Sequence, residues 1–402
     1  MKKIYIYYPS EITGGAEFLL KTVCDFIKNS MRTCIVDIKD GWLSNNVSDV
    51  AVIYVNEFQK IYLDENSVLI TTANLIRKLD LYFYGEFKII AWMVQINNLT
   101  PAVPKIGSFQ YNRFFKFLFK NSILNSEYKK IDKLTLYLDK SNSIYSMDEA
   151  CNEVFYRYFK RKINRYLPVV IPEEKFLEID KIMEKPSDIL KCVWVGRLDG
   201  EFKNPILHHI LIEISDYAKI NNKNIIFNVI GNGPGLKNAE NIASSLEGIE
   251  INFLGERRGE ELRRFICSHD MGFAMGTSAL EISACGTPVV LLDASYGVVP
   301  KAYRYQWLYE SKGYCIGRSI DTSPDKTLGN TKTIEDIFSE LIIDGEKIRN
   351  LCYAHVRRYH SIDTLREKIL IAIQQANSNF QEMASLNLFS KPYWYFIKRF
   401  IK

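Results

Sequence analysis

Two cationic side chains are spaced so that one strand end could present both to an anion. Arg197 and Lys203 lie in the segment 196–203, directly after the apolar run 191–195. Ligands bind at the carboxyl ends of the strands of an open parallel sheet, and an arginine with a lysine there can hold a diphosphate. Their charges would stabilise a leaving group that becomes more negative in the transition state. A solvated loop is the weaker alternative, because both residues follow the strand so closely.

Glycine-rich turns follow two other expected strands. Gly14 and Gly15 stand between the first strand and a helix that carries Glu17, while Gly231 and Gly233 end the strand near residue 230. Glycine lets a ligand approach the backbone closely, and the free N–H groups of a following helix attract an anion. A tight strand-to-helix turn, with Glu17 favouring the first helical turn, accounts for Gly14 and Gly15 equally well.

A further turn, Gly276-Thr277-Ser278, precedes a helix that carries Glu281. Its N–H groups could also contact a phosphate. Ser278 and Glu281 have the spacing of a capping box, in which two side chains satisfy the first N–H groups of a helix. That structural role competes with a role of Glu281 in binding a ligand.

These residues resemble the glycosyltransferase family 4-like group of the GT-B superfamily, which transfers sugars from nucleoside-diphosphate donors. The likeness covers nearly the whole chain, and its most specific part is the run Leu-Glu-Ile-Ser-Ala-Cys-Gly-Thr-Pro-Val-Val at 280–290. It implies an α/β chain with the GT-B fold, in which two Rossmann-like parallel-sheet domains face a central cleft. It also implies that Arg197 and Lys203 contact the donor diphosphate and that Glu281 holds the donor ribose, a role that we favour over the capping box.

The resemblance and the glycine turns together define the candidate site. We expect Arg197, Lys203 and Glu281 to be catalytic. We expect no metal and no cofactor, with the nucleoside-diphosphate sugar as a co-substrate, because the chain has no Asp-x-Asp motif and no His/Cys cluster with metal spacing. The expected donor-binding residues are Gly14, Gly15, Gly196, Arg197, Lys203, Gly231, Gly233, Gly276, Thr277, Ser278 and Glu281.

The chain departs from the family pattern in two places that bear on mechanism. Phe273 stands eight residues before the ribose-binding glutamate, where the family commonly has another glutamate. The first half has no histidine, and Gln95 and Asn97 occupy the stretch where many relatives place one. The acceptor-side candidates are therefore Glu17, Gln95 and Asn97. An inverting transfer would need a carboxylate such as Glu11 or Glu17 as its base, whereas a retaining transfer needs none, so we favour retention.

Two other functions fit the same fold. A nucleotide-sugar epimerase shares the architecture, but such enzymes use acidic groups and histidines from both domains. A catalytically degenerate GT-B scaffold protein would bind a donor or partner enzymes without turnover. Phe273 and Gln95 support the scaffold, whereas the retained Arg197, Lys203 and Glu281 argue against it.

The elements that must position these residues follow a repeated pattern. Short apolar runs alternate with helical patterns, as in βαβ units that build a parallel sheet. Strands are expected over Lys3–Tyr8, Thr33–Ile38, Val50–Val55, Ser67–Thr71, Lys88–Val94, Ser122–Asn125, Tyr166–Ile171, Lys191–Val195, Asn224–Ile230, Glu250–Leu254, Met271–Met275 and Pro288–Leu292. Helices are expected over Gly14–Ile27, Pro205–Ile220, Leu236–Leu246, Glu260–Cys267 and Ser278–Cys285.

The pattern restarts in the second half, so we expect two domains; 402 residues, 47% of them hydrophobic, can bury two cores. With the roles that the resemblance implies, residues 1–172 form an N-terminal Rossmann-like domain that binds the acceptor, and residues 189–360 form a C-terminal Rossmann-like domain that binds the donor. A linker at 173–188 joins them. After the second domain come a closing helix at 361–380, which packs back on the first domain, and a basic amphipathic tail at 381–402.

Composition limits the compartment and the partners. The formal net charge of +5 is small for this length and the bases are spread, which argues against nucleic-acid binding. The eight cysteines form no C-x-x-C pair and are expected to be reduced core residues. The N-terminus has no signal-peptide pattern and no apolar run could span a bilayer, so we expect a cytoplasmic protein.

Two segments, 111–120 and 393–402, place aromatic and basic residues on opposite faces of an expected helix. Such helices bind anionic membrane surfaces, although a core helix with a solvated basic side explains 111–120 as well. We therefore expect peripheral association with the inner face of the plasma membrane. The expected acceptor is a glycan or lipid-linked glycan, in bacterial cell-surface polysaccharide synthesis such as that of lipopolysaccharide or capsule.

Overall fold

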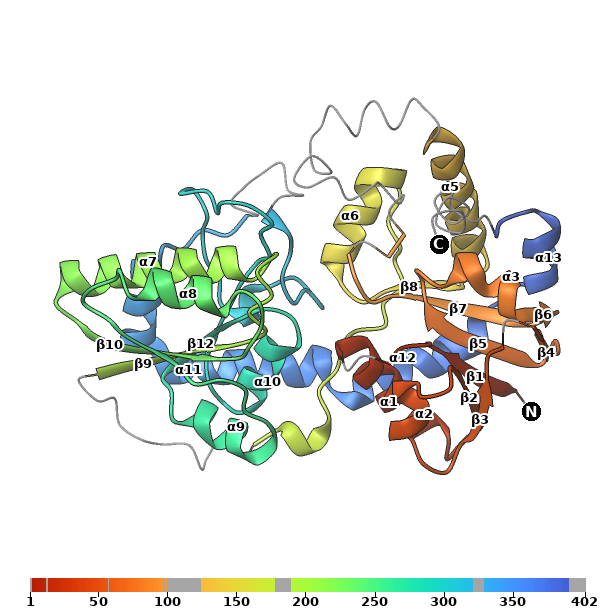
Figure 1. The fold of residues 1–402 in the computed structure, drawn as a ribbon, viewed down its shortest axis with the longest axis horizontal. Helices are drawn as coiled ribbons and strands as arrows, with labels where there is room; N and C mark the ends of the chain where they lie inside the picture. Colours follow the sequence, from red (N-terminus) through yellow and green to blue (C-terminus); the bar gives the residue numbers. More distant parts are fainter. Residues whose placement is uncertain are drawn as a thin grey trace. The chain divides into compact units, whose positions relative to one another are not determined.

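The structure is a computed structural model that describes residues 2–11, 14–56, 58–96, 98–99, 124–177, 189–320 and 329–389. The chain divides into two compact units, unit 1 with Met1–Val169 and Asp363–Lys402, and unit 2 with Val170–Ile362. Each unit has its own parallel sheet and is described by itself (Figure 1). Every helix in the described ranges is too short or too polar to cross a membrane.

Unit 1 is built on a six-stranded parallel sheet with the order β3-β2-β1-β5-β7-β8. A strand that is covered on both faces needs a continuous apolar run, and β5 (Ser67–Thr72) is buried at every position. The other strands of this sheet are β1 (Lys3–Tyr7), β2 (Arg32–Asp37), β3 (Ala51–Tyr54), β7 (Lys88–Met93) and β8 (Ile144–Ser146). A separate pair is formed by β4 (Ile61–Leu63) and β6 (Phe83–Gly85).

Helices and short helical turns connect these strands. In α1 (Gly15–Ile27) the buried apolar residues recur at helical spacing, so one face of the helix packs on the sheet. The remaining helical elements before unit 2 are α2 (Trp42–Asn46), η1 (Ile76–Lys78), α3 (Leu79–Tyr82), α5 (Leu124–Lys140) and α6 (Glu149–Phe159).

The chain returns to unit 1 after unit 2 is complete. Both α12 (Ile362–Gln375) and α13 (Phe380–Ser385) lie with unit 1, where the Phe380 ring stacks on Phe87 with 4.4 Å between the ring centroids. The Ile89 N–H donates to Ser378 Oγ at 2.8 Å, which ties the same segment to β7.

The tail that the sequence predicts over 381–402 therefore begins too early. Met383 is fully buried, and only 8% of the surface of Phe389 is exposed, so the chain is part of the unit 1 core up to that residue. The reason is that α13 is amphipathic and covers apolar surface of its own unit. The remaining tail and the expected helix at 111–120 lie outside the described residues.

Unit 2 is built on a five-stranded parallel sheet with the order β11-β10-β9-β12-β13. Its strands are β9 (Ile189–Val195), β10 (Asn224–Ile230), β11 (Glu250–Phe253), β12 (Met271–Ala274) and β13 (Val289–Leu291). Its helical elements are η3 (Glu173–Lys175), α7 (Asn204–Asn221), α8 (Leu236–Ala243), α9 (Gly259–Cys267), α10 (Thr277–Ala284), η5 (Leu308–Glu310) and α11 (Ile334–His360).

Most strands occur where the sequence predicts them, but two predictions in the first half are wrong. The expected strand Ser122–Asn125 is helical at its two described residues, which belong to α5; a short apolar run does not distinguish the two structures. The range Tyr166–Ile171 forms isolated bridges only. The sixth strand is instead β8, whose three residues are too few to show a periodic pattern.

Candidate functional site

The direction of the strand order in unit 2 reverses between β9 and β12. From β9 the chain moves outward to β10 and β11, and it then crosses to the other side of β9 to form β12 and β13. The connections that leave the carboxyl ends of β9 and β12 therefore go in opposite directions. Open α/β sheets bind ligands at such a point. The segment 196–203 follows β9, and the turn at 276–278 follows β12.

Asp199 organises the loop that follows β9. Its Oδ1 atom accepts hydrogen bonds from the N–H groups of Glu201, Phe202 and Lys203 at 3.0, 3.1 and 3.2 Å. The loop is thereby folded into a tight turn that leads into α7. A Cβ atom added to Gly196 would lie 3.4 Å from Lys203 Nζ, so the lysine side chain folds back over the end of β9.

The two cations of this loop have no counter-ion of their own. Neither Arg197 nor Lys203 makes a side-chain hydrogen bond or an ion pair with any residue that the structure describes. Arg197 is exposed, whereas burial lowers the pKa of Lys203 and the charge of Arg197 lowers it further, with Asp199 acting in the opposite direction. An anion bound here would offset the desolvation of the Lys203 charge and reduce its repulsion by Arg197.

The glycines after β10 are required by packing within unit 2. Gly231 and Gly233 have φ angles of +148° and +151°, and Cβ atoms there would lie 1.9 Å from the oxygen of Gly196 and 2.3 Å from the oxygen of Leu198. The Gly196 N–H donates to Ile230 O at 3.0 Å. The loops after β9 and β10 thus touch backbone to backbone, which accounts for both glycines without a ligand; a contact with a donor stays a prediction.

The turn after β12 differs from the expected capping box. Gly276 is the N-cap of α10 with φ +67°, and the helix begins at Thr277 without a side-chain cap. Ser278 is therefore already the second helical residue, and Glu281 lies too far along the helix to reach the N-cap. The capping-box interpretation is wrong because a glycine with positive φ starts the helix earlier. Thr277 is exposed at this end of α10.

Glu281 is instead paired with Lys175, a residue that the sequence places in the expected linker. Lys175 Nζ forms a hydrogen-bonded ion pair with Glu281 Oε1, and the two side chains keep 42% and 26% of their surfaces exposed. Nearby, the Leu177 N–H donates to Ala284 O at 3.0 Å, so this segment packs along α10. Sequence reasoning missed Lys175 because its partner is 106 residues away and no local pattern links them.

Comparisons with known proteins agree with this geometry. Residues 176–303 match the family Glycosyl transferases group 1. The chain is a glycosyltransferase, and the group 1 match lies within its unit 2. Among curated proteins, no significant match was found.

Similar solved structures show that this glycosyltransferase has the GT-B fold. HepE of Anabaena in complex with UDP is 13% identical, with a TM-score of 0.53 over 93% of this chain and 100% of that chain. The pneumococcal O-GlcNAc transferase GtfA in complex with UDP and GlcNAc is 10% identical, with a TM-score of 0.50 over 94% and 99%. At these identities the likeness establishes the fold of two Rossmann-like domains.

The first-half candidates of the glycosyltransferase lie in unit 1. Glu17 is 5% exposed, and Ser10 Oγ donates to its Oε1 at 2.7 Å. Its Oε2 atom would lie 2.8 Å from a Cβ on Gly14, so the carboxylate folds back against the turn. This favours the interpretation of Gly14 and Gly15 as a tight turn, and their contact with a donor stays a prediction.

Gln95 follows β7 and is exposed. The Val94 and Gln95 N–H groups both donate to Asn98 Oδ1, at 2.7 and 3.0 Å, which closes a compact turn there. Asn97 lies outside the described residues. The glycosyltransferase can present Gln95 to a ligand, because its backbone is held while its exposed side chain makes no hydrogen bond with a described residue.

Phe273 and an aromatic stretch near residue 305 belong to the hydrophobic core of unit 2. Phe273 is fully buried in β12, 5.8 Å from the Phe227 ring, so the glycosyltransferase uses this position for its core. Tyr303, Tyr305 and Trp307 form an aromatic stretch that is also buried. It fills the core.

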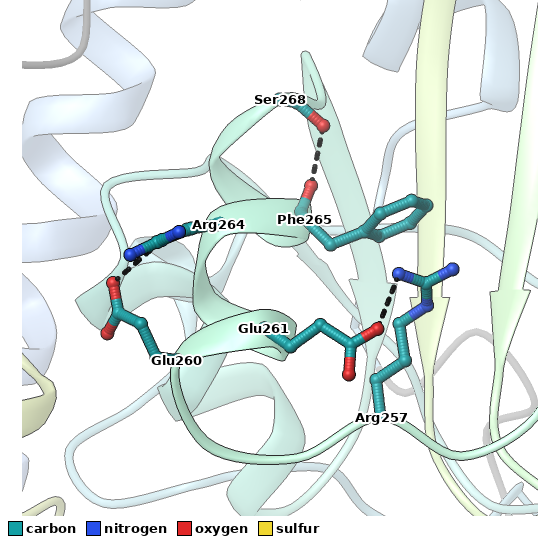
Figure 2. Close-up of a pocket in the computed structure, with 6 residues that line it drawn as sticks. All are labelled: Arg257, Glu260, Glu261, Arg264, Phe265 and Ser268. Atoms are coloured by element: carbon teal, nitrogen blue, oxygen red, sulfur yellow. Dashed lines mark hydrogen bonds and ion pairs between the residues drawn. The ribbon is translucent and has the colours of Figure 1, made fainter.

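The pocket drawn in Figure 2 lies on the outer surface of α9 and not at the strand ends of the glycosyltransferase. Arg257 pairs with Glu261 at 2.9 Å, and Arg264 pairs with Glu260 at 3.3 Å. The Arg257 guanidinium also lies 4.5 Å from the centre of the Phe265 ring. Because α9 and the loop before it pair these charges with one another, the pocket is a solvated helix face. Within the described residues, no group of His, Cys, Asp or Glu is arranged to hold a metal ion.

Proposed function

We propose that this glycosyltransferase moves a sugar from a nucleoside-diphosphate sugar, with a UDP-sugar as the first candidate, to a glycan or lipid-linked glycan acceptor. The observation that carries the proposal is the pair of cations without counter-ions, Arg197 and Lys203, at the point where the strand order of unit 2 reverses. The UDP found in the structures of HepE and GtfA supports uridine as the first base to test.

The proposed chemistry needs positive charge where the diphosphate departs. Arg197 and Lys203 would bind it and stabilise the charge that grows as the glycosidic bond breaks. The N-terminus of α10 adds N–H groups without a side-chain cap on the next strand of the sheet. Three sources of positive potential make a metal-independent transfer the mechanism that we propose, with Glu281 hydrogen-bonding the ribose.

We propose a retaining reaction, in which the departing phosphate accepts the proton of the acceptor hydroxyl. Glu17, one of the two carboxylates that an inverting reaction could use, is buried and accepts a hydrogen bond from Ser10. It is therefore poorly placed to act as an exposed base. Proton NMR of the first product formed tests this, since a product anomer opposite to that of the donor would contradict retention.

We also propose that the acceptor is presented at the cytoplasmic membrane surface, for the synthesis of a bacterial cell-surface polysaccharide. In α5, Lys129, Lys130 and Lys133 are exposed and form no ion pair with a described residue. Asp132 of the same helix is already paired with Arg161. This leaves one face of α5 with a surplus of positive charge, which favours an anionic lipid surface.

The decisive experiment is a thermal-shift panel of UDP, GDP, ADP and CDP and their common sugar conjugates. A ligand that binds only the native state raises its stability by about 2.7 kcal/mol at one hundred times Kd. We expect one diphosphate to stabilise the wild-type protein and Arg197→Ala to weaken that ligand by roughly tenfold to a hundredfold.

Arg264→Ala is the matched control, because it removes the same charge from the outer face of α9. The control should respond as the wild type does. If no diphosphate stabilises the wild-type protein, or if Arg197→Ala retains full affinity, the proposed donor site is wrong.

A further inference from the structure

The ion pair between Lys175 and Glu281 leaves half of the carboxylate available. Lys175 binds the Oε1 atom, while Oε2 has no hydrogen bond with any other described residue. The Glu281 side chain keeps 26% of its surface exposed. One oxygen is thus held and the other is free to accept a hydrogen bond, which is how a carboxylate is oriented toward a ligand.

The backbone around Lys175 is held on both sides, so its side chain starts from a fixed point. The Tyr353 hydroxyl donates to Leu177 O at 3.0 Å. The Phe176 ring packs edge-on against Tyr353 at 5.7 Å, and the Arg357 guanidinium lies 3.8 Å from the centre of the Phe176 ring. The segment that carries the lysine is therefore fixed against α11 and α10.

A free carboxylate next to a diphosphate would repel it. Glu281 lies in the helix that follows β12, and the proposed diphosphate ligand Arg197 follows β9, the adjacent strand. Lys175 neutralises the charge of Glu281 without occupying its second oxygen. The pair can accept a hydrogen bond from a ribose hydroxyl while the repulsion of the neighbouring phosphates is reduced.

We propose that Lys175 is a positioning residue for the donor ribose. It holds Glu281 so that Oε2 accepts a hydrogen bond from a ribose hydroxyl, and it thereby makes the site selective for ribonucleoside over deoxyribonucleoside diphosphates. The inference rests on the proposed function, in which Glu281 contacts the donor ribose.

The test measures binding of UDP, 2′-deoxy-UDP and 3′-deoxy-UDP by isothermal titration calorimetry. GDP, ADP or CDP and their deoxy forms replace UDP if the thermal-shift panel favours one of them. Loss of a hydrogen bond to a charged group lowers affinity by roughly tenfold to a hundredfold, so the wild type should prefer the ribonucleotide over one deoxy form by that factor.

The Lys175→Met variant should weaken binding of the ribonucleotide by about tenfold or more and bind the deoxy form nearly as the wild type does, so that the preference is lost. The Lys175→Arg variant, which keeps the positive charge, should keep most of the preference for the ribonucleotide. Lys219→Met is the matched control, because Lys219 is equally exposed, at 43%, and is paired with Glu247 at 3.6 Å in the same unit. It should leave the preference unchanged.

The outcomes separate this inference from the function on which it rests. If Glu281→Ala abolishes the preference but Lys175→Met keeps it and only lowers the unfolding temperature, the ion pair between Lys175 and Glu281 is structural and the inference is wrong. The same holds if Lys175→Met weakens all three nucleotides equally. If the wild type shows no preference, or Glu281→Ala retains it, the ribose contact itself is wrong.

Discussion

Lys203 and Lys175 show what decides the role of a lysine at the scale of one residue. Burial and the charge of Arg197 lower the pKa of Lys203, and the lysine forms no ion pair with a described residue, so its ammonium group is available to a bound anion. Lys175 has a carboxylate partner and can act only through it. The first lysine is a candidate for contact with the donor, and the second is a candidate for positioning.

Gly231 offers a prediction at the same scale, because any side chain placed there would collide with backbone atoms, which cannot move aside as a flexible side chain can. Gly231→Ala places a Cβ 1.9 Å from Gly196 O at φ +148°. We expect the free energy of unfolding to fall by at least about 4 kcal/mol, since the loops after β9 and β10 must separate. Urea unfolding of the purified variant measures this loss.

Gly255→Ala is the control for backbone strain alone. Gly255 also has a positive φ, +68°, but an added Cβ would meet nothing within 4 Å. We expect a loss of roughly 1–2 kcal/mol, the cost of a left-handed conformation. Equal losses in the two variants would contradict the steric explanation for Gly231.

Helix starts show how one local pattern leads to different outcomes at the scale of elements. Thr333 and Asp336 form a real capping box at the start of α11, with the Asp336 N–H donating to Thr333 Oγ1 at 3.1 Å. Ser278 and Glu281 have the same spacing, yet α10 is capped by Gly276. The spacing is necessary for the box, but the residue that precedes it decides where the helix begins.

This difference predicts a loss of stability for one of two similar substitutions and little change for the other. Thr333→Ala should lower the free energy of unfolding by about 1 kcal/mol, because an N–H group at the start of α11 loses its acceptor. Ser278→Ala should change it by less than about 0.5 kcal/mol. Thermal or urea unfolding measures both, and a larger loss for Ser278→Ala would mean that its hydroxyl does cap α10.

At the scale of the whole molecule, unit 1 is completed by a segment that comes after unit 2 in the chain. Phe380, Met383 and Phe389 are buried in its core. Removal of everything after Gln375 would therefore unfold part of unit 1 as well as remove the basic end of the chain. A test of membrane binding must cut after Phe389.

We expect the chain cut after Phe389 to keep its unfolding temperature and to lose most of its binding to anionic vesicles. The reason is that Lys391, Lys398, Arg399 and Lys402 are removed, each worth about 1 kcal/mol near a charged surface. Vesicle sedimentation with and without phosphatidylserine measures the binding. Neutral vesicles are the control, and undiminished binding of the cut chain to anionic vesicles would contradict a role of the tail.

The amino-acid sequence by itself determined the features that depend on neighbours along the chain. The strands of unit 2 appear within two residues of their expected positions, because the alternation of apolar runs and helical patterns is local. The placement of Arg197 and Lys203 after β9 is predictable for the same reason. Strand β8 was not predictable, because its residues Ile-Tyr-Ser lie among polar neighbours and form no apolar run, unlike those of the equally short β13.

Tertiary structure alone decided the contacts between residues that are far apart in the chain. Lys175 meets Glu281 because η3 packs along α10, Gly231 meets Gly196 because β9 and β10 are paired, and Phe380 meets Phe87 because the chain returns to unit 1. Each contact depends on how the sheets order their strands. Sequence periodicity reports which face of an element is buried, but not which other element covers it.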